Sequence, residues 1–176
     1  MSDRSAPGEL AESFQPVVGV AVTLRPLLRA DIDIESAFVS GLSPQTRHNR
    51  LLGGAITITR EYLERLTSVD YSRDMALAAI VMLEKEMLIG VARYVLEKDD
   101  RSAEFAIVIA DAWQGRGIGR RMLARLAEIA RRRGVPSLYG DILSTNRPML
   151  GLVQKLGFRL SRNPDDFTLT RATLAL

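Results

Sequence analysis

Apolar residues recur along the chain with two different periods, and the change of period separates predicted helices from predicted strands. Helical spacing behind a capping residue predicts a helix, whereas an unbroken apolar run between turn residues predicts a strand. The predicted helices cover residues 31–40, a stretch that starts at 43–44, 59–66, 117–133 and 147–156. The predicted strands cover residues 22–25, 75–83, 87–96, 102–110, 138–143, 158–160 and 167–172.

The stretch 117–133 is the clearest of these elements, because one of its faces is apolar along its whole length. That face carries Ile118, Met122, Leu126, Ile129 and Ala130. Gly134 follows at the position where helices commonly end. The strands at 75–83 and 87–96 are separated by the polar residues 84–86, which predicts an antiparallel hairpin.

The order of elements is one strand, several helices, three strands, and then alternating helices and strands. This order predicts an α/β (α+β) fold with a mixed central β-sheet flanked by helices. With 176 residues and 47% hydrophobic content, the chain can bury one core. Residues 1–18 mix Ser, Pro, Gly and acidic residues without a period, so we expect a flexible leader followed by a single domain over 19–176.

Composition excludes several classes of function. The formal charge of +3 is too small to indicate nucleic acid as a partner. The chain has no cysteine, which excludes disulfides, thiolate metal sites and a cysteine nucleophile, and we expect no metal. The sequence begins without a signal peptide and contains no apolar run of about 18 residues, so we expect a cytoplasmic protein that does not associate with a membrane.

A glycine-rich loop, Gln114–Gly119, joins an apolar predicted strand to the basic helix at 117–133. Glycines at 115, 117 and 119 allow a sharp turn and let a ligand approach the backbone N–H groups. The start of the helix adds partial positive charge, and Arg116 and Arg120 flank the loop. These features indicate a phosphate-binding loop; the alternative is a tight turn that simply requires glycine.

Two common nucleotide-binding motifs do not fit this loop. A Walker loop needs Gly-Lys-Ser/Thr, and the chain contains no such tripeptide. A Rossmann fingerprint counted from Gly115 would need glycine where Arg120 stands, and it normally opens the first β–α unit of a domain.

The pattern Gln/Arg-x-x-Gly-x-Gly/Ala is met by Gln114, Gly117 and Gly119, and Asn146 then opens a second helix that ends at residues 155–158. In these features the chain resembles the GNAT superfamily of N-acetyltransferases over roughly residues 20–172. The resemblance implies that acetyl-CoA is the co-substrate, with its pantetheine arm against a strand and its pyrophosphate on the loop. The implied binding residues are Ile107, Val108, Ile109, Gln114, Gly115, Arg116, Gly117, Ile118, Gly119, Arg120 and Asn146.

Further stretches resemble the acetyltransferase domain that is fused to NDP-forming acyl-CoA synthetase-like proteins. They are residues 42–44 with Arg47, 70–77, 90–94, 103–106 and 138–150. Members of that group acetylate protein lysines, which implies a protein lysine as the acceptor, with a small-molecule amine as the alternative. No synthetase portion accompanies these stretches, so we expect a free-standing relative. The sequence is compatible with an oligomer.

The reaction implied by the resemblance needs a base, because removing the proton of a lysine with pKa near 10.4 costs about 4–5 kcal/mol at neutral pH. The lysine-acetylating relatives place a general-base glutamate where Glu104 stands, ten residues before Gln114. The alternative role for Glu104 is an ordinary ion pair with an arginine such as Arg93. Asp141 is the reserve base, and His48 is a weaker candidate in a polar stretch.

The general acid is unassigned. Many relatives carry a tyrosine seven positions after the residue equivalent to Asn146, and here that position is Val153. Tyr139 and Tyr71 are candidates, but a thiolate leaving group with pKa near 8.5 can depart unaided. Asn146 itself is expected to cap the following helix.

Two other classes of function remain open. The arginines between 116 and 133 prompt a nucleic-acid hypothesis, which is weakened by an aromatic content of only 6%. The missing tyrosine prompts a second hypothesis, a non-catalytic sensor that binds acyl-CoA without turnover.

Overall fold

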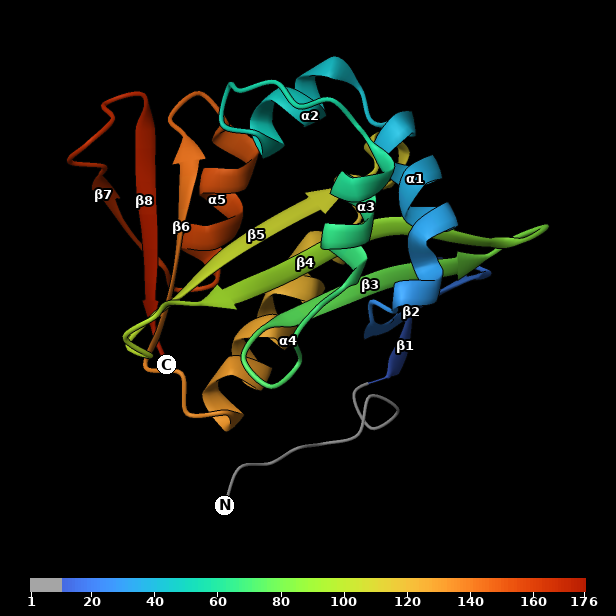
Figure 1. Ribbon diagram of the computed structural model, residues 1–176, viewed down its shortest axis with the longest axis horizontal. Coiled ribbons are helices and arrows are strands. Elements are labelled where there is room, and N and C mark those ends of the chain that lie inside the picture. Colours follow the sequence, from blue (N-terminus) through green and yellow to red (C-terminus); the bar gives the residue numbers. More distant parts are fainter. Residues whose placement is uncertain (1–10) are drawn as a thin grey trace.

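The computed structural model describes residues 11–176, and within this range it contains one eight-stranded sheet with the order β1-β2-β3-β4-β5-β6-β8-β7 (Figure 1). The strands are β1 (Glu12–Val17), β2 (Val20–Pro26), β3 (Met75–Met82), β4 (Glu86–Leu96), β5 (Ala103–Ile109), β6 (Ser137–Leu143), β7 (Arg159–Arg162) and β8 (Leu169–Ala175). Only β5 and β6 run parallel among the strand pairs of this range. The predicted mixed sheet and the predicted hairpin of β3 and β4 are confirmed.

Helices cover both faces of the sheet (Figure 1). They are α1 (Ile32–Gly41), α2 (Pro44–Arg50), α3 (Arg60–Thr67), α4 (Ile118–Arg132) and α5 (Arg147–Lys155). Helices α1 and α3 lie on one face, where Phe38 and Leu42 pack with Val91 of β4. Helix α4 lies on the opposite face (Figure 1). No helix within residues 11–176 is both long and apolar enough to cross a bilayer.

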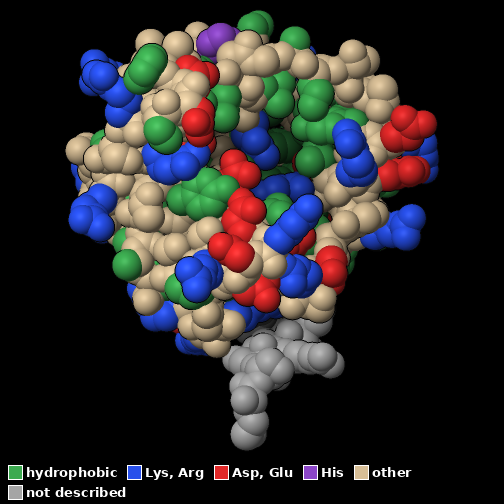
Figure 2. Space-filling view, turned by 60° about the vertical axis from the view of Figure 1, so that its left-hand side comes forward, with side chains coloured by type: hydrophobic (Ala, Val, Ile, Leu, Met, Phe, Trp, Pro, Cys, Tyr) green, Lys and Arg blue, Asp and Glu red, His purple; other side chains and the backbone are tan. Residues whose placement is uncertain are grey.

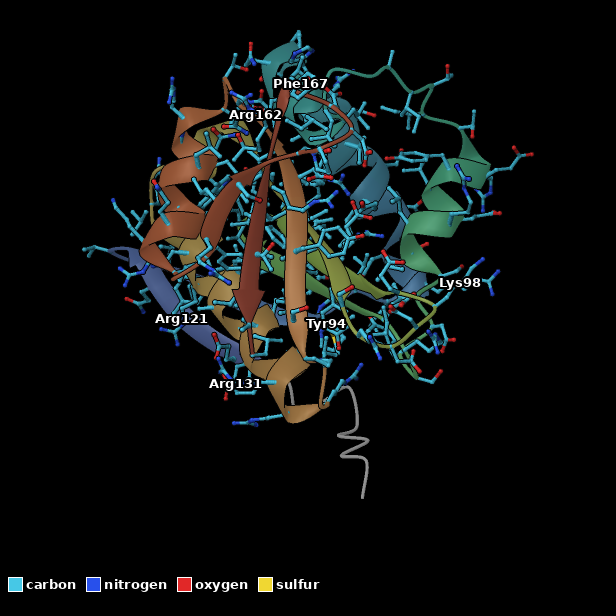
Figure 3. All side chains as sticks on the ribbon, turned by 90° about the vertical axis from the view of Figure 1, so that its left-hand side faces the viewer. Tyr94, Lys98, Arg121, Arg131, Arg162 and Phe167 are labelled. Carbon is cyan, nitrogen blue, oxygen red and sulfur yellow. The ribbon has the colours of Figure 1, made fainter. Side chains whose placement is uncertain are left out.

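Helix α4 forms because its apolar stripe meets the largest buried cluster of the protein. Its Ile118, Met122 and Leu126 are fully buried, as the sequence predicts. Each such side chain contributes about 1.5–3 kcal/mol of burial free energy. Arg131 extends from the exposed side of the helix, whereas Arg121 reaches the edge strand β1 (Figure 3).

The expected flexible leader is wrong over residues 12–17, which form strand β1. Glu12 and Phe14 pair with Leu24 and Val22 of β2, and the Phe14 ring packs on the core. Arg121 of α4 then binds the Glu12 carboxylate at 3.0 Å. Polar residues and a proline interrupt the apolar pattern of this edge strand, so the sequence does not predict it. Pairing with β2 and the contact with Arg121 of α4 hold it in place. Residues 1–10 lie outside the described residues, and the expectation for them stays a prediction.

Strands β5 and β6 pair only at Ala103 with Leu138 and at Glu104 with Tyr139, and then separate. The next residue of β5, Phe105, places its ring directly against the backbone of Gly140 on β6. A Cβ atom built on Gly140 would lie 2.7 Å from this ring. Gly140 therefore makes room for Phe105 at the point where the two strands part.

We predict that Gly140→Ala destabilises the protein by about 1–3 kcal/mol, because the added methyl group forces the buried ring to move. Chemical denaturation would measure the change in the free energy of unfolding. Gly151→Ala is the matched control: a Cβ there meets nothing within 4 Å, and helix propensity favours alanine by about 1 kcal/mol. Equal stability of Gly140→Ala and the unaltered protein would contradict this account of the strand separation.

Candidate active site

The separation of β5 and β6 opens a groove of about 1240 Å³. Residues of β5 form one wall, and the loop before α4, the end of β6, the first turns of α5 and one side of α2 form the others. Figure 2 shows this side of the molecule, where acidic and basic side chains lie close together around a hollow. The groove is large enough for an extended, coenzyme-sized ligand.

The glycine loop ends on the N-terminus of α4, at one end of this groove. Gly115 and Gly117 have φ angles of +72° and +79°, which side chains with a Cβ rarely adopt, so both glycines are required by the backbone. Gly117 is also the N-cap of α4. The first backbone N–H groups of a helix lack partners within it, so the loop offers donors and partial positive charge to an anion.

The wall formed by β5 has an open backbone edge. Backbone N–H and C=O groups alternate between the two edges of a strand, and Ala110 N donates to Ile89 O on β4 at 2.8 Å. Ile109 therefore faces the other edge, where its carbonyl accepts from Gln114 Nε2 at 3.0 Å. Ile107, two residues earlier, faces the same edge, where an extended ligand can pair as a peptide pairs with a sheet.

Most of the residues predicted to bind acetyl-CoA share this groove. Its lining includes Glu104, Ile107, Val108, Ile109, Gln114, Gly115, Gly117, Gly119, Arg120 and Asn146. Two predicted residues do not line it: Arg116 Nε donates to Ala112 O at 3.1 Å, and Ile118 is buried in the core. Because the Ile118 side chain is apolar and buried, only its backbone N–H group is available to a phosphate.

Glu104 lies at the last paired position before the strands separate, with its side chain exposed to the groove. Burial by the surrounding protein raises the pKa of Glu104, and the Asp141 and Glu97 carboxylates raise it further. Glu104 forms no ion pair within residues 11–176, and Arg93 instead donates to Leu66 O at 3.3 Å. The alternative of a Glu104–Arg93 pair is therefore wrong.

Asp141, the reserve base, also lines the groove but is held by Arg171. Two hydrogen bonds of 2.9 and 2.8 Å join the guanidinium to both carboxylate oxygens. A bidentate pair of this kind occupies lone pairs of both carboxylate oxygens. His48 lines the groove from α2, on an exposed turn.

Both candidate general acids, Tyr139 and Tyr71, donate their hydroxyl groups to other parts of the protein. Tyr139 donates to Glu97 Oε1, and burial followed by this hydrogen bond raises the pKa of Tyr139. Tyr71 donates to Leu27 O, and burial raises the pKa of Tyr71 to about 12. Val153 is fully buried in the core, and Asn146 caps α5 by accepting from Met149 N at 3.3 Å, as predicted.

Sequence reasoning missed the residues that tie α2 to the glycine loop. Asp111 accepts from Ser43 N and Ser43 Oγ at 2.9 and 2.6 Å and from Thr46 Oγ1 at 2.7 Å. These bonds, with the Ser43 side chain as the largest cause, lower the pKa of Asp111 to about 2. Gln114 Nε2 adds a bond to Thr46 at 3.1 Å. The contacts join segments more than 60 residues apart, so no local pattern predicts them.

A strand edge that opens beside a helix N-terminus suits an extended ligand that carries amides and a phosphate group, as an acyl-coenzyme A does. Comparison with known sequences agrees: residues 54–158 match the model of the acetyltransferase (GNAT) family. The chain belongs to this family. Structures of the same fold have been solved with coenzyme A and with acetyl-CoA, and the chain is an acetyl-CoA-dependent acetyltransferase.

Similar proteins include Acetyltransferase PA5475 of Pseudomonas aeruginosa, 36% identical over 159 residues that cover 90% of this chain and 86% of the relative. Acetyltransferase Pat of Mycolicibacterium smegmatis is 31% identical over 137 residues, which cover 76% of this chain and 40% of that protein. The solved GNAT domain of S. lividans PAT has a TM-score of 0.85 at 22% identity, over 98% of this chain and all of that domain.

We predict that Arg120→Met weakens acetyl-CoA binding at least about tenfold, because Arg120 lines the groove at the α4 N-terminus and a charge-assisted bond is worth about 1.5 kcal/mol or more. Titration calorimetry would measure the dissociation constant. Arg121→Met is the matched control, since Arg121 is not among the residues that line the groove and pairs with Glu12 of β1. Equal weakening by both changes would mean that only the general charge of the helix matters.

We predict that Asp111→Ala destabilises the protein by about 1 kcal/mol at pH 7, a value already reduced for solvent exposure. The pKa of Asp111 is lowered in the folded state, so its stabilisation is present above the ordinary pKa of 3.8 and disappears as the pH falls toward 2. Denaturation at several pH values should show the difference from the unaltered protein shrinking below pH 4. A difference independent of pH would contradict the ionised role of Asp111.

Proposed function

We propose that the chain acetylates a primary amine, a protein lysine, by direct attack of the amine on acetyl-CoA with Glu104 as the general base. The observation that carries the proposal is the position of Glu104, which faces the groove at the point where β5 and β6 separate. The base needs a carboxylate without an ion-pair partner there. Within residues 11–176 Glu104 forms no ion pair, whereas Asp141 is bound by Arg171.

The residues of the groove suit an acetyl-CoA in one orientation. The pyrophosphate would lie on the N–H groups at the start of α4, next to Arg120, and the pantetheine amides would pair with Ile107 and Ile109. The bound co-substrate supplies an activated thioester carbonyl. In this orientation the arm runs along β5 from the loop toward Glu104, which would bring the thioester near the base.

Glu104 then removes a proton from the attacking amine, either directly or through a water molecule. Its raised pKa, caused first by burial, makes it a stronger base than an ordinary glutamate. Among the described residues that line the groove there is no tyrosine. A coenzyme A thiolate, with an ordinary thiol pKa near 8.5, is a good enough leaving group to depart without an acid.

The protein-lysine acceptor is supported by likeness to the group that contains Pat. The chain aligns with the Pat protein at 31% identity, and it shares the fold of the S. lividans PAT domain over nearly its full length. Incubation with labelled acetyl-CoA and a cell extract, split into protein and small-molecule fractions, tests the acceptor. Label in protein lysines is expected; label in neither fraction, despite coenzyme binding, would leave only the sensor hypothesis.

We predict that Glu104→Gln lowers kcat by about 100- to 10,000-fold, the usual contribution of a general base, and changes the acetyl-CoA dissociation constant less than about twofold. Because the base is active when ionised, the rate of the unaltered enzyme rises with pH through the Glu104 pKa, which lies above the ordinary 4.5. Glu104→Gln should lose this limb in a steady-state pH profile.

Glu97→Gln provides a matched control for this profile. It removes a carboxylate that raises the pKa of Glu104 but keeps an oxygen that can accept from Tyr139. The limb should therefore move to lower pH, with kcat on the plateau largely retained. A profile that Glu104→Gln leaves unchanged would assign the base to another residue.

A further inference from the structure

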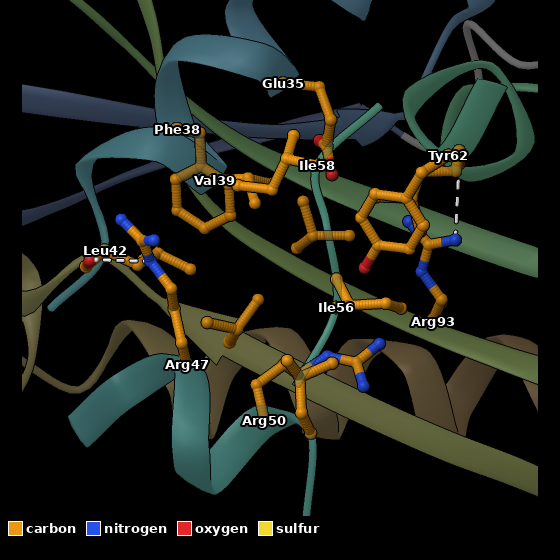
Figure 4. A pocket seen from close by; sticks show the side chains of 14 residues that line it. Glu35, Phe38, Val39, Leu42, Arg47, Arg50, Ile56, Ile58, Tyr62 and Arg93 are labelled. Atoms are coloured by element: carbon orange, nitrogen blue, oxygen red, sulfur yellow. Dashed lines mark hydrogen bonds between the residues drawn. The ribbon is translucent and has the colours of Figure 1, made fainter. Parts of the chain in front are cut away.

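A second, smaller cavity of about 50 Å³ lies beside the groove, enclosed by α1, α2, α3 and the strands β4 and β5 (Figure 4). Side chains alternate across a strand, and Val108, which lines this cavity, lies on the same face of β5 as Glu104. The cavity therefore opens on the face from which an acceptor would approach the base. Its volume suits a small polar group rather than a whole substrate.

The charged side chains of this cavity are unbalanced. Three guanidinium groups line it, those of Arg47, Arg50 and Arg93, against the single carboxylate of Glu35. Arg47 is occupied by the carbonyl oxygens of Leu42 and Ser40 at 3.0 and 2.7 Å. Arg93 donates from one of its terminal nitrogens to Leu66 O at 3.3 Å, which leaves its second terminal nitrogen and the guanidinium of Arg50 for a ligand; burial lowers the pKa of both arginines.

Glu35 does not neutralise these two arginines directly. Its side chain is nearly fully buried at 2% exposure, and within residues 11–176 its Oε2 atom has no hydrogen-bond partner. No nitrogen of Arg50 or Arg93 in this part of the chain lies within 4.0 Å of the Glu35 carboxylate. Figure 4 shows the Glu35 carboxylate and the two guanidinium groups around the same space.

Arg50 connects this cavity to the groove, because it lines both of them, as Val108 does. The charges of Glu104 and Glu35 both act on Arg50. A group bound between Arg50 and Arg93 would therefore lie beside the general base.

We propose that the acceptor of this enzyme carries a carboxylate close to its amine, and that Arg50 and Arg93 bind this carboxylate in the cavity. The inference rests on the proposed function for the amine and deepens it by naming the acceptor's second group. Guanidinium groups bind carboxylates in bidentate, charge-assisted geometry. Their positive charge also favours the neutral form of the neighbouring amine, which is the form that attacks. An acceptor with a second ammonium group is disfavoured by the same charges.

Matched amines test the proposal. The enzyme is assayed with ω-amino carboxylates of three to six carbons, each beside the alkylamine of equal length, for example 5-aminopentanoate and pentylamine. For at least one length we expect kcat/KM to favour the carboxylate about 10- to 100-fold, the usual effect of charge-assisted hydrogen bonds. Arg93→Met should lower this ratio at least tenfold. Arg60→Met, on the exposed side of α3 with 79% side-chain exposure, is the matched control and should keep the ratio.

The carboxylate can belong to a small amino acid or to an acidic residue next to an acceptor lysine. Peptides with a lysine beside glutamate, compared with the same peptides carrying glutamine, distinguish these sources. A preference confined to the small amines would mean that the carboxylate belongs to a small amino acid. A preference confined to the peptides would mean that it belongs to an acidic residue next to the acceptor lysine. Equal kcat/KM within every pair of both kinds would overturn the proposal.

A measurement without turnover separates this proposal from the proposed function. Propanoate is titrated into the protein with coenzyme A present, and the binding is followed by NMR. We expect propanoate to bind and Arg93→Met to weaken this binding at least tenfold. If thermal unfolding shows that the Arg93→Met variant is not folded, Arg50→Met is used in its place. Binding without acetylation of any amine would refute only the proposed function. Acetylation without propanoate binding or carboxylate preference would refute only the carboxylate site.

Discussion

The functional geometry of this protein depends on the short parallel pairing between β5 and β6. Two residue pairs hold the strands together, and the Phe105 ring against Gly140 then fills the space where they part. The ring also meets Phe158 edge-on, with 5.1 Å between centroids. Because the strands separate beyond Glu104, one backbone edge of β5 lacks a strand partner and can serve a ligand. The groove, the exposed carboxylate and the access of the coenzyme all follow from this separation.

Electrostatics then assigns different roles to carboxylates that lie close together. Arg171 binds Asp141 through both oxygens, and Tyr139 donates to Glu97, so both groups have fixed partners. Glu104 has none in the described chain, yet it feels the repulsion of the other two. One glutamate is thus left as a base whose pKa is raised by burial and further by the charges of its neighbours.

Helix α2 links the coenzyme side of the groove to the acceptor side. Its start is fixed to the glycine loop through Asp111, and its end carries Arg50 into the space between the groove and the small cavity. A short helix tied at one end by charge-assisted hydrogen bonds positions a charged side chain more firmly than a loop does. The same connection places Arg50 between the groove and the small cavity, both of which it lines.

The sequence by itself determined the mixed sheet, the buried face of α4, the cap at Asn146 and the glycine loop, because each follows from a local period, a capping residue or a backbone requirement at Gly115 and Gly117. The resemblance of the sequence to the GNAT superfamily also identified most of the predicted binding residues that line the groove. Only the tertiary structure decided that residues 12–17 form a strand and that Arg171 occupies Asp141. It also decided that Glu35, Arg50 and Arg93 enclose one cavity. These features join residues that are distant along the chain, and no local pattern records which charges the packed sheet and helices bring together.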